Sequence, residues 1–168
     1  FNDIASQMVS FSSYRDLWNK FSKSNMSIQD KLDVNRELNN ILKKTDLFNS
    51  VVQDILVISD NGYYFTTIGQ DGLAANYDYW SKEWYQKAKD TTGNVYVHIL
   101  GLHNQDFYSK KRAITAKNKT FSISFALQNS KGKVSGALIY NFDITQLAEV
   151  LGASNYEENG KVAILNEE

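Results

Sequence analysis

The sequence predicts an α+β fold in which helices pack on a five-stranded antiparallel sheet. The front of the chain repeats apolar side chains at helical spacing, and this pattern ends near residue 46. Residues 47–152 then contain β-rich stretches, with Gly, Asn, Asp and Ser in the turns because the chain has no proline. Short turns between the last strands favour antiparallel neighbours. An aromatic segment between the second and third strands is expected to form a helix that covers the sheet.

Two helices are expected before the sheet. The first spans residues 3–23, where apolar residues recur every three to six positions. Ser27 is the expected N-cap of the second helix, because Asp30 follows it at the capping-box position. We expect residues 1–46 to form a helical stalk that continues from a preceding segment, such as a membrane helix.

Turn signals separate the predicted strands. Val51, Val52 and the apolar residues at positions 55–58 form a β-rich run, and the return strand begins at Tyr63. Between them stands Asp60-Asn61-Gly62, a strong hairpin signal because Asn-Gly tolerates positive φ. The other predicted elements are strands over 95–100, 120–128 and 133–143, a polar loop over 101–112, a tight turn over 129–132, a helix over 145–151 capped by Asp143 or Thr145, and a short strand over 161–165.

Residues 77–89 hold more aromatic surface than any other stretch of the chain. Five aromatic residues fall within nine positions, and Trp80 and Trp84 stand at helical spacing. In one interpretation their rings form the apolar face of a helix that packs on the sheet and has Gly93 as its C-cap. In the other, the helix covers a pocket, and some of its rings face a ligand together with Lys82. Aromatic walls with one or two placed charges are common in small-molecule sites.

Composition excludes several functions. A net charge of −1 gives no basic field for nucleic acid. Without cysteine the chain has no disulfide, no thiolate zinc site and no cysteine nucleophile. It also lacks a Gly-rich phosphate loop, a His-Glu-x-x-His motif and a Gly-x-Ser-x-Gly motif, so an enzyme is the least supported class. Two histidines cannot build a His-rich metal site alone, and the sequence predicts no cofactor.

Three stretches carry a family resemblance: residues 82–88 (Lys-Glu-Trp-Tyr-Gln-Lys-Ala), residues 132–144, and the hairpin with its Asp-Asn-Gly turn. They resemble the extracellular Cache sensor domains of bacterial receptors, which have a PAS-like fold. Residues 82–88 are similar to the Arg-x-Trp-Tyr-x-x-Ala helix of that family. Residues 132–144 resemble its closing strand, and the hairpin with its Asp-Asn-Gly turn fits its first two strands. The resemblance covers residues 1–152. The tail over 160–166 is similar to the opening strand of the second module in double-Cache receptors.

The resemblance implies three parts. Residues 1–46 would form the stalk, residues 47–152 the PAS-like sensor module, and residues 153–168 a linker with the first strand of a truncated second module. The chain would then be the membrane-distal module of a double-Cache histidine kinase or chemoreceptor. A single-module receptor is the alternative.

The resemblance also implies a ligand site. The amino-acid-binding branch of the family uses a tyrosine, an arginine five residues later, a Trp-Tyr pair and a later aspartate. In this assignment Lys82 binds a carboxylate, although lysine lacks the bidentate geometry of arginine, and Asp143 binds an ammonium. Because His98 stands where the branch prefers an acid, a small carboxylate, a sugar or a peptide is as open as an amino acid. The candidate site residues are Tyr77, Lys82, Trp84, Tyr85, Tyr96, His98 and Asp143.

The resemblance implies a small-molecule-sensing domain of a bacterial signal-transduction receptor, such as a two-component histidine kinase, a chemoreceptor or a diguanylate cyclase. It would stand on the extracellular face of the cell membrane, anchored in the full-length receptor and paired as a homodimer through the N-terminal helices. The expected ligand is an amino acid or a small carboxylate, and no nucleic-acid partner is expected. The alternative is a non-sensing dimerisation or spacer module of the same fold.

Overall fold

A computed structural model describes residues 14–43, 51–69, 73–74, 76–92, 97–104, 107–109 and 119–146 of the chain. Neighbouring strands are antiparallel, in the order β2-β1-β5-β4-β3. This arrangement confirms the predicted PAS-like α+β fold with its five-stranded sheet. The elements are helices α2 (Arg15–Phe21), α3 (Ile28–Lys43) and α4 (Glu83–Lys89), and strands β1 (Val52–Ser59), β2 (Tyr64–Thr66), β3 (Val97–Asn104), β4 (Lys119–Gln128) and β5 (Val134–Phe142).

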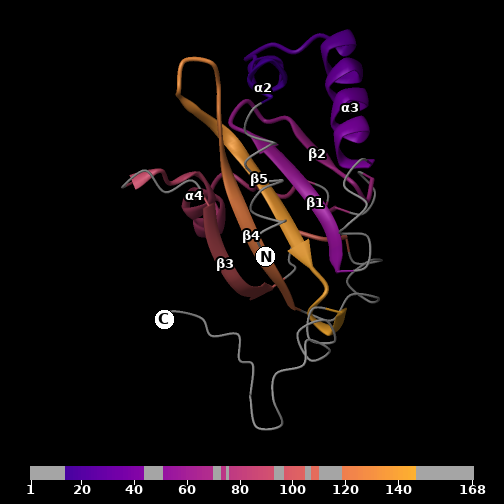
Figure 1. Cartoon of the computed structure of the whole chain (residues 1–168), viewed down its shortest axis with the longest axis vertical. Helices are drawn as coiled ribbons and strands as arrows, with labels where there is room; N and C mark the ends of the chain where they lie inside the picture. Colours follow the sequence, from indigo (N-terminus) through magenta and orange to yellow (C-terminus); the bar gives the residue numbers. More distant parts are fainter. Residues whose placement is uncertain are drawn as a thin grey trace, which may run out of the picture.

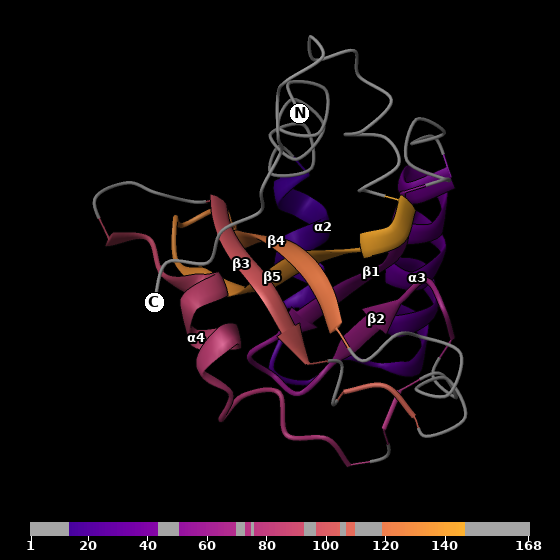
Figure 2. The same ribbon diagram turned by 90° about the horizontal axis from the view of Figure 1, so that it is seen from below.

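The sheet lies between two layers of helices. Helices α2 and α3 lie beside each other (Figure 1), and the view from below shows them on one side of the sheet with α4 on the other (Figure 2). The alternation of side chains along each strand explains both contacts. On β1, Ile55 and Val57 pack in the core with α2 and α3, whereas Leu56 and Ile58 pack in the core with α4. The central strands are therefore buried on both faces.

Helix α3 begins as the sequence predicts. The backbone N–H of Asp30 donates to Ser27 Oγ at 3.0 Å, and the backbone N–H of Ser27 donates to Asp30 Oδ2 at 3.1 Å. These reciprocal bonds form a capping box. Lys23 adds a 2.9 Å hydrogen bond to Asp30, and this bond contributes most to lowering the pKa of that carboxyl to about 2. The capping box thus also ties α3 to the end of α2.

The predicted hairpin turn joins the two helical layers. Gly62 has φ +91°, which favours glycine at this position. The Asn61 side-chain amide donates to the backbone oxygens of Phe21 and Lys23 at 2.9 Å and 2.6 Å, at the end of α2. On the other face, Lys89 at the end of α4 forms a 2.7 Å ion pair with Asp60. One turn therefore contacts helices on both faces of the sheet.

Three predictions about segment ends are wrong. Helix α4 begins at Glu83 rather than at residue 77, because Asp78 Oδ1 accepts the backbone N–H groups of Trp80 and Ser81 and holds the preceding segment in a turn. The helix ends at Lys89 with Asp90 as its C-cap, so Gly93 is not the cap. The polar loop predicted to begin at residue 101 begins later, because β3 continues to Asn104.

The continuation of β3 depends on an irregularity that single-residue propensities do not predict. Gly101 has φ +70°, and the pairing of β3 with β4 shifts register between Ile99 and Gly101. Such a bulge lets a strand bend and continue. The predicted helix over residues 3–13, the strand over 161–165 and the linker over 153–160 lie outside the described residues.

Replacing Gly136 by alanine is expected to destabilise the sheet. A Cβ at this position would lie 2.2 Å from the backbone oxygen of Ile58, and backbone cannot move aside as a flexible side chain can. We expect Gly136→Ala to lower the free energy of unfolding by about 3 kcal/mol, measured by urea denaturation. Gly132→Ala is the control, because nothing lies within 4 Å of its Cβ position. Its only cost is the strain of a side chain at positive φ, about 1 kcal/mol. Equal losses at the two positions would contradict this packing argument.

Candidate ligand-binding site

Helix α4 is fixed to the end of β1. The indole Nε1 of Trp80 donates to the backbone oxygen of Ser59 at 2.9 Å, and the hydroxyl of Tyr85 donates to Asp60 Oδ1 at 3.0 Å. Tyr85 is fully buried, and this burial, together with the charge of Asp60, raises the pKa of its hydroxyl. The side chain that sequence reasoning assigned to the ligand thus helps to attach α4 to the hairpin turn.

Lys82 is the N-cap residue of α4 and has an extended backbone. Its Nζ lies 4.8 Å from the centre of the Tyr77 ring. Both side chains are partly buried. A cation above an aromatic face is held by the ring's negative surface. The structure therefore brings together the predicted tyrosine and the predicted cation.

An aromatic cluster lies on the α4 face of the sheet. The centre of the Trp84 ring lies 5.7 Å from that of Phe107 and 6.2 Å from that of His103. The His103 ring stacks on Trp84 at an interplanar angle of 23°. Phe107 also contacts Tyr77 at 6.3 Å and Tyr108 at 4.5 Å. Phe107 and Tyr108 come from a segment that pairs with the segment before α4, since Tyr108 forms an isolated bridge with Leu73. The aromatic cluster consists of Tyr77, Tyr79, Trp84, His103, Phe107 and Tyr108.

Two polar atoms of the aromatic cluster are buried without a partner. Among the described residues, the Tyr79 hydroxyl and the Trp84 indole Nε1 make no hydrogen bond. Tyr79 is only 2% exposed, and burial raises the pKa of its hydroxyl. Ser109 Oγ, next to Tyr108 in the chain, is also buried without a hydrogen-bond partner among the described residues. Buried polar groups normally have a partner, so these orphaned atoms indicate a polar group or water that is not part of the protein.

A row of hydrogen-bonded polar side chains crosses the sheet and shares His103 and Tyr108 with the aromatic cluster. His103 Nε2 lies 2.7 Å from Ser122 Oγ, and Ser122 Oγ donates to Asn141 Oδ1 at 2.6 Å. Asn141 Nδ2 donates to Asp54 Oδ1 at 2.8 Å, and the Tyr108 hydroxyl donates to Asp54 Oδ2. We call these five residues the polar row. It links β3, β4, β5 and β1 to the segment that carries Tyr108.

The donors in the polar row all point toward Asp54. The Ser122 hydroxyl donates its single hydrogen bond to Asn141, so its oxygen accepts the hydrogen bond from His103 Nε2. Asn141 accepts on its oxygen and donates with its nitrogen to Asp54. Tyr108 donates to the same carboxylate from the other side. Asp54 therefore accepts a hydrogen bond at each of its two oxygens and ends the row.

The other predicted site residues lie apart from the aromatic cluster or outside the described part of the chain. His98 Nε2 is close to the backbone oxygen of Asp90, beyond the C-terminus of α4. Tyr96 lies outside the described residues. The structure thus brings Tyr77, Lys82 and Trp84 together.

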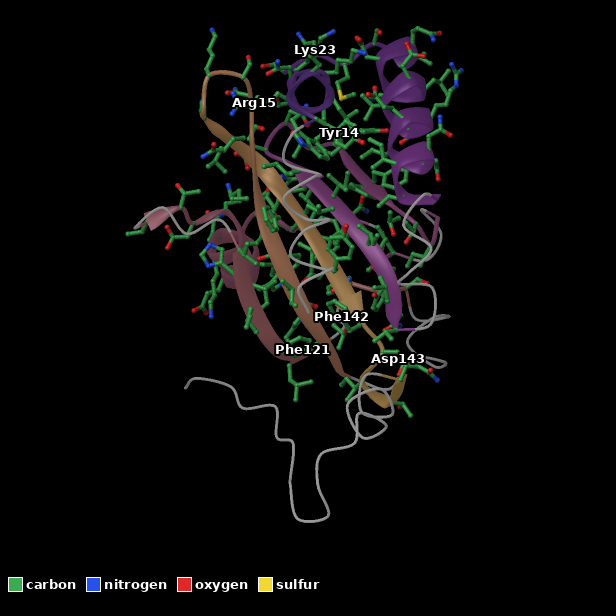
Figure 3. The ribbon with its side chains drawn as sticks, in the orientation of Figure 1. Tyr14, Arg15, Lys23, Phe121, Phe142 and Asp143 are labelled. Atoms are coloured by element: carbon green, nitrogen blue, oxygen red, sulfur yellow. The ribbon has the colours of Figure 1, made fainter. Side chains whose placement is uncertain are left out.

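Asp143 lies at the end of β5, next to Phe142 and at the opposite end of the protein from Lys23 (Figure 3). Its Oδ1 accepts the backbone N–H of Thr145 at 2.8 Å and that of Gln146 at 3.2 Å, which confirms the predicted capping role. Gly136, seven residues earlier, pairs with Ser59, where α4 is attached. At a rise of about 3.3 Å per residue, Asp143 stands roughly 23 Å along the strand from that point.

Two hollows lie elsewhere on the described surface. A groove of about 590 Å³ lies along the outer side of α4, and its lining has charges of both signs, including Glu83, Lys87 and Asp90. A smaller hollow of about 280 Å³ lies at the α2–α3 connection, beside Lys31 and Tyr63. Within the described ranges, no three acidic, histidine or cysteine side chains come together as a metal site would require. None of the described helices has the length and apolar character to cross a membrane.

Comparison with solved structures identifies the fold. The ligand-binding domain of the Pseudomonas aeruginosa PAO1 amino acid chemoreceptor PctC, in complex with GABA, aligns with 90% of this chain and 59% of its own at 12% identity and a TM-score of 0.51. The ligand-binding domain of the Campylobacter jejuni chemoreceptor Tlp3, in complex with L-norvaline, aligns with 89% of this chain and 58% of its own at 16% identity and a TM-score of 0.52. The chain has the Cache-type fold of chemoreceptor ligand-binding domains.

A further solved structure shares the Cache-type fold, although its sequence is only distantly similar. The ligand-binding domain of the Pseudomonas fluorescens chemoreceptor CtaA, in complex with L-isoleucine, covers 88% of this chain and 55% of its own at 12% identity and a TM-score of 0.51. No family model and no curated protein matches the chain. The chain spans less than two thirds of the length of these chemoreceptor domains.

Sequence reasoning missed the polar row of this Cache-type domain. The signals were present, because Asp54 is a charged residue within an apolar strand, and Ser122 and Asn141 occupy the same face of adjacent strands. These polar residues can be recognised as one group only when the order of the strands is known. Asp54 and Asn141 are 87 residues apart in the chain, and only the pairing of β1 with β5 places them opposite each other.

Breaking the polar row is expected to cost more than removing a neighbouring hydroxyl. Ser122→Ala leaves His103 and Asn141 each without this partner, and we expect the free energy of unfolding to fall by about 2 kcal/mol. Ser124→Ala is the matched control on the same face of β4, since its equally buried hydroxyl makes only a 3.5 Å bond to the backbone oxygen of His98. Urea denaturation of the two variants measures the difference, and equal losses would show that the row contributes nothing beyond packing.

Proposed function

We propose that this chain is a small-molecule-sensing domain of a bacterial signal-transduction receptor, with its ligand bound at the aromatic cluster beneath α4. The Cache-type fold supports this proposal, because the solved structures that share it are chemoreceptor ligand-binding domains. The receptor would be a chemoreceptor, a histidine kinase or a diguanylate cyclase. The ligand would be an amino acid or a small carboxylate.

The observation that carries this proposal is the pair of orphaned donors in the aromatic cluster. An indole Nε1 can only donate a hydrogen bond, and a buried donor without a partner costs about 1–3 kcal/mol. Trp84 Nε1 and the Tyr79 hydroxyl have this status among the described residues, and their rings are 6.3 Å apart. A ligand with acceptor atoms would remove both costs when it binds.

Lys82 supplies the positive charge for such a ligand. Its ammonium lies above Tyr77, and Tyr77 contacts Tyr79 at 4.7 Å and Phe107 at 6.3 Å within the aromatic cluster. A cation over one ring of a cluster that contains two neutral donors favours an anionic acceptor, and a carboxylate is the simplest one. The structures of the PctC and Tlp3 domains, which have the same fold, are complexes with GABA and L-norvaline, and both compounds contain a carboxylate.

We further propose that the domain stands outside the cell membrane, anchored in the full-length receptor, and pairs through its N-terminal helices. Helix α3 supports the pairing, because Ile28 and Leu32 are 79% and 53% exposed and stand four residues apart on one face. A dimerising spacer of the same fold would use this face without a ligand. The orphaned donors of the aromatic cluster favour the sensing function over the spacer.

Thermal-shift measurements with amino acids, organic acids and sugars test the proposed function. A ligand at 100 times its dissociation constant is expected to add ~2.7 kcal/mol to the free energy of unfolding. Lys82→Ala should weaken the binding of a carboxylate ligand about three- to tenfold, since it removes one partly exposed cation.

Lys87→Ala is the matched control for this test, because Lys87 is an exposed lysine of the same helix and lines the outer groove. It should leave the affinity unchanged. A ligand whose affinity falls with Lys87→Ala but not with Lys82→Ala binds in the outer groove instead. The absence of any stabilising compound would favour the spacer.

A further inference from the structure

The two end strands of the described sheet differ in length and in their protection from other chains. Strand β2 ends the sheet on one side and has three residues, whereas β3 ends it on the other and has eight. Edge strands are usually protected from pairing with another chain by shortness, by proline or by charged side chains. The sequence of β3 is Val-His-Ile-Leu-Gly-Leu-His-Asn, without Asp, Glu, Lys, Arg or Pro. Of the two end strands, β3 is therefore the less protected.

Apolar side chains are exposed along the first half of β3. Val97 and Ile99 are 40% and 60% exposed. They stand opposite Phe125 and Ile123 of β4, which are buried in the core on the α2–α3 face. The apolar surface of this face thus continues from the core to the β3 end of the sheet. A single exposed apolar residue is common on protein surfaces, but two at successive positions on one face of an uncharged edge strand form a surface on which another strand can pack.

The bulge in β3 limits the available edge to the first half of the strand. The register with β4 shifts between Ile99 and Gly101, and a bulge bends the strand at that point. Before the bulge, the side chain of His98 points to the α4 face, since its Nε2 is close to the backbone oxygen of Asp90. We call Val97, His98 and Ile99 the β3 edge. It has apolar side chains on one face and, on the other, a histidine that contacts its own chain.

A second copy of this chain matches the β3 edge. In an antiparallel pair centred on His98, the two-fold axis places Val97 of each copy opposite Ile99 of the other, so the exposed apolar side chains of both copies meet on one face. Symmetric pairing also brings the charges of a strand close to their own copies, and like charges opposite each other destabilise a sheet. The uncharged sequence of β3 avoids this repulsion, which is specific to self-pairing.

The β3 edge and the exposed face of α3 lie on opposite sides of the protein. Figures 1 and 2 show α3 over the β1–β2 end of the sheet and β3 at the other end. A copy bound at the β3 edge is therefore a different copy from one that pairs through Ile28 and Leu32 of α3. The chain thus offers two surfaces to two different neighbours.

We propose that the β3 edge is a self-association surface, at which two copies pair antiparallel around His98 and join their sheets. This inference goes beyond the proposed function, because it needs neither a ligand nor the pairing of the N-terminal helices. In a receptor that is paired through those helices, the β3 edge would link one dimer to the next. Pairing over residues 97–99 buries less than the ~800 Å² per partner of a stable interface, so the isolated chain should associate with a dissociation constant on the order of 0.1–1 mM.

Analytical ultracentrifugation of two variants tests this surface. Ile28→Lys removes association through α3, because Ile28 is the more exposed residue of that face. We expect this variant still to associate reversibly as its concentration rises to about 1 mM. Adding Ile99→Lys should weaken the remaining association at least about tenfold, since a lysine on an edge strand opposes pairing. The two substitutions are matched, because each replaces an exposed isoleucine by lysine, on opposite sides of the protein.

A single introduced cysteine locates the contact, because the chain has no cysteine of its own. In the proposed register, residue 98 lies opposite residue 98 of the other copy. Residues paired in this way have Cα atoms about 4.5–5.5 Å apart, a separation that a disulfide can span. With a mild oxidant, His98→Cys should form the cross-linked dimer about tenfold faster than Ser130→Cys, a control at an exposed turn position. Circular dichroism and thermal unfolding confirm that each variant is folded.

Three results would overturn the proposal: an Ile28→Lys variant that stays monomeric up to about 1 mM, association that Ile99→Lys leaves unchanged, or equal cross-linking rates for the two cysteines. Should His98→Cys not fold, an equimolar mixture of Val97→Cys and Ile99→Cys provides the same test. The register places residue 97 opposite residue 99, so cross-links should then form between the two variants rather than within each. None of these measurements uses a ligand, so their failure leaves the proposed function untouched.

Discussion

A negative charge in the middle of the sheet constrains the α4 face of this protein. Asp54 stands in a strand whose neighbours are apolar, and its carboxylate needs partners that the apolar core does not provide. Two members of the polar row, Asn141 and Tyr108, bond to the carboxylate, and Ser122 bonds to Asn141. Asn141 and Ser122 occupy adjacent strands, and Tyr108 reaches the carboxylate from the segment above the sheet. The need to satisfy one acid therefore fixes polar side chains on neighbouring strands and positions Phe107 and Tyr108 against α4.

The hairpin turn after β1 connects the α4 face of the sheet to the helices α2 and α3 on the opposite face. Asp60 accepts from Tyr85 and pairs with Lys89 of α4, while the neighbouring Asn61 donates to the backbone at the end of α2. A displacement of α4 by a ligand would act on a turn that α2 also contacts. In the proposed receptor, this turn would connect the site to the N-terminal helices, and a ligand would shift their arrangement only by its differential affinity for the two conformations.

Local sequence patterns predicted much of the fold. Alternation predicted the last two long strands, Asn61-Gly62 predicted the hairpin, and Ser27 with Asp30 predicted the start of α3, because each signal acts over a few residues. The start of α4 was missed because the Asp78 side chain competes for backbone N–H groups within a segment of helical spacing. The end of β3 was missed because a bulge at Gly101 depends on its pairing with β4.

The candidate site was predicted only where its residues are close in sequence. Tyr77, Lys82 and Trp84 fall within eight positions, and the motif that contains them was visible. The polar row was not predicted, because Asp54 joins Asn141 and Tyr108 only after the strands pair. The same limit explains why Asp143 stood out in the sequence: its place at the end of a strand fits both a ligand contact and a helix cap, and the structure shows the cap.

The signal of the Trp84 indole N–H tests the central claim most directly. The chain has three tryptophans, so a nitrogen–proton correlation spectrum contains three indole signals that single Trp→Phe variants assign. Trp80 is an internal control, because its Nε1 is bonded to the backbone oxygen of Ser59. With L-norvaline or GABA at saturation, we expect the Trp84 signal to move as its orphaned donor gains an acceptor, while the Trp80 signal stays in place. A bound ligand that leaves the Trp84 signal unchanged would contradict a site at the aromatic cluster.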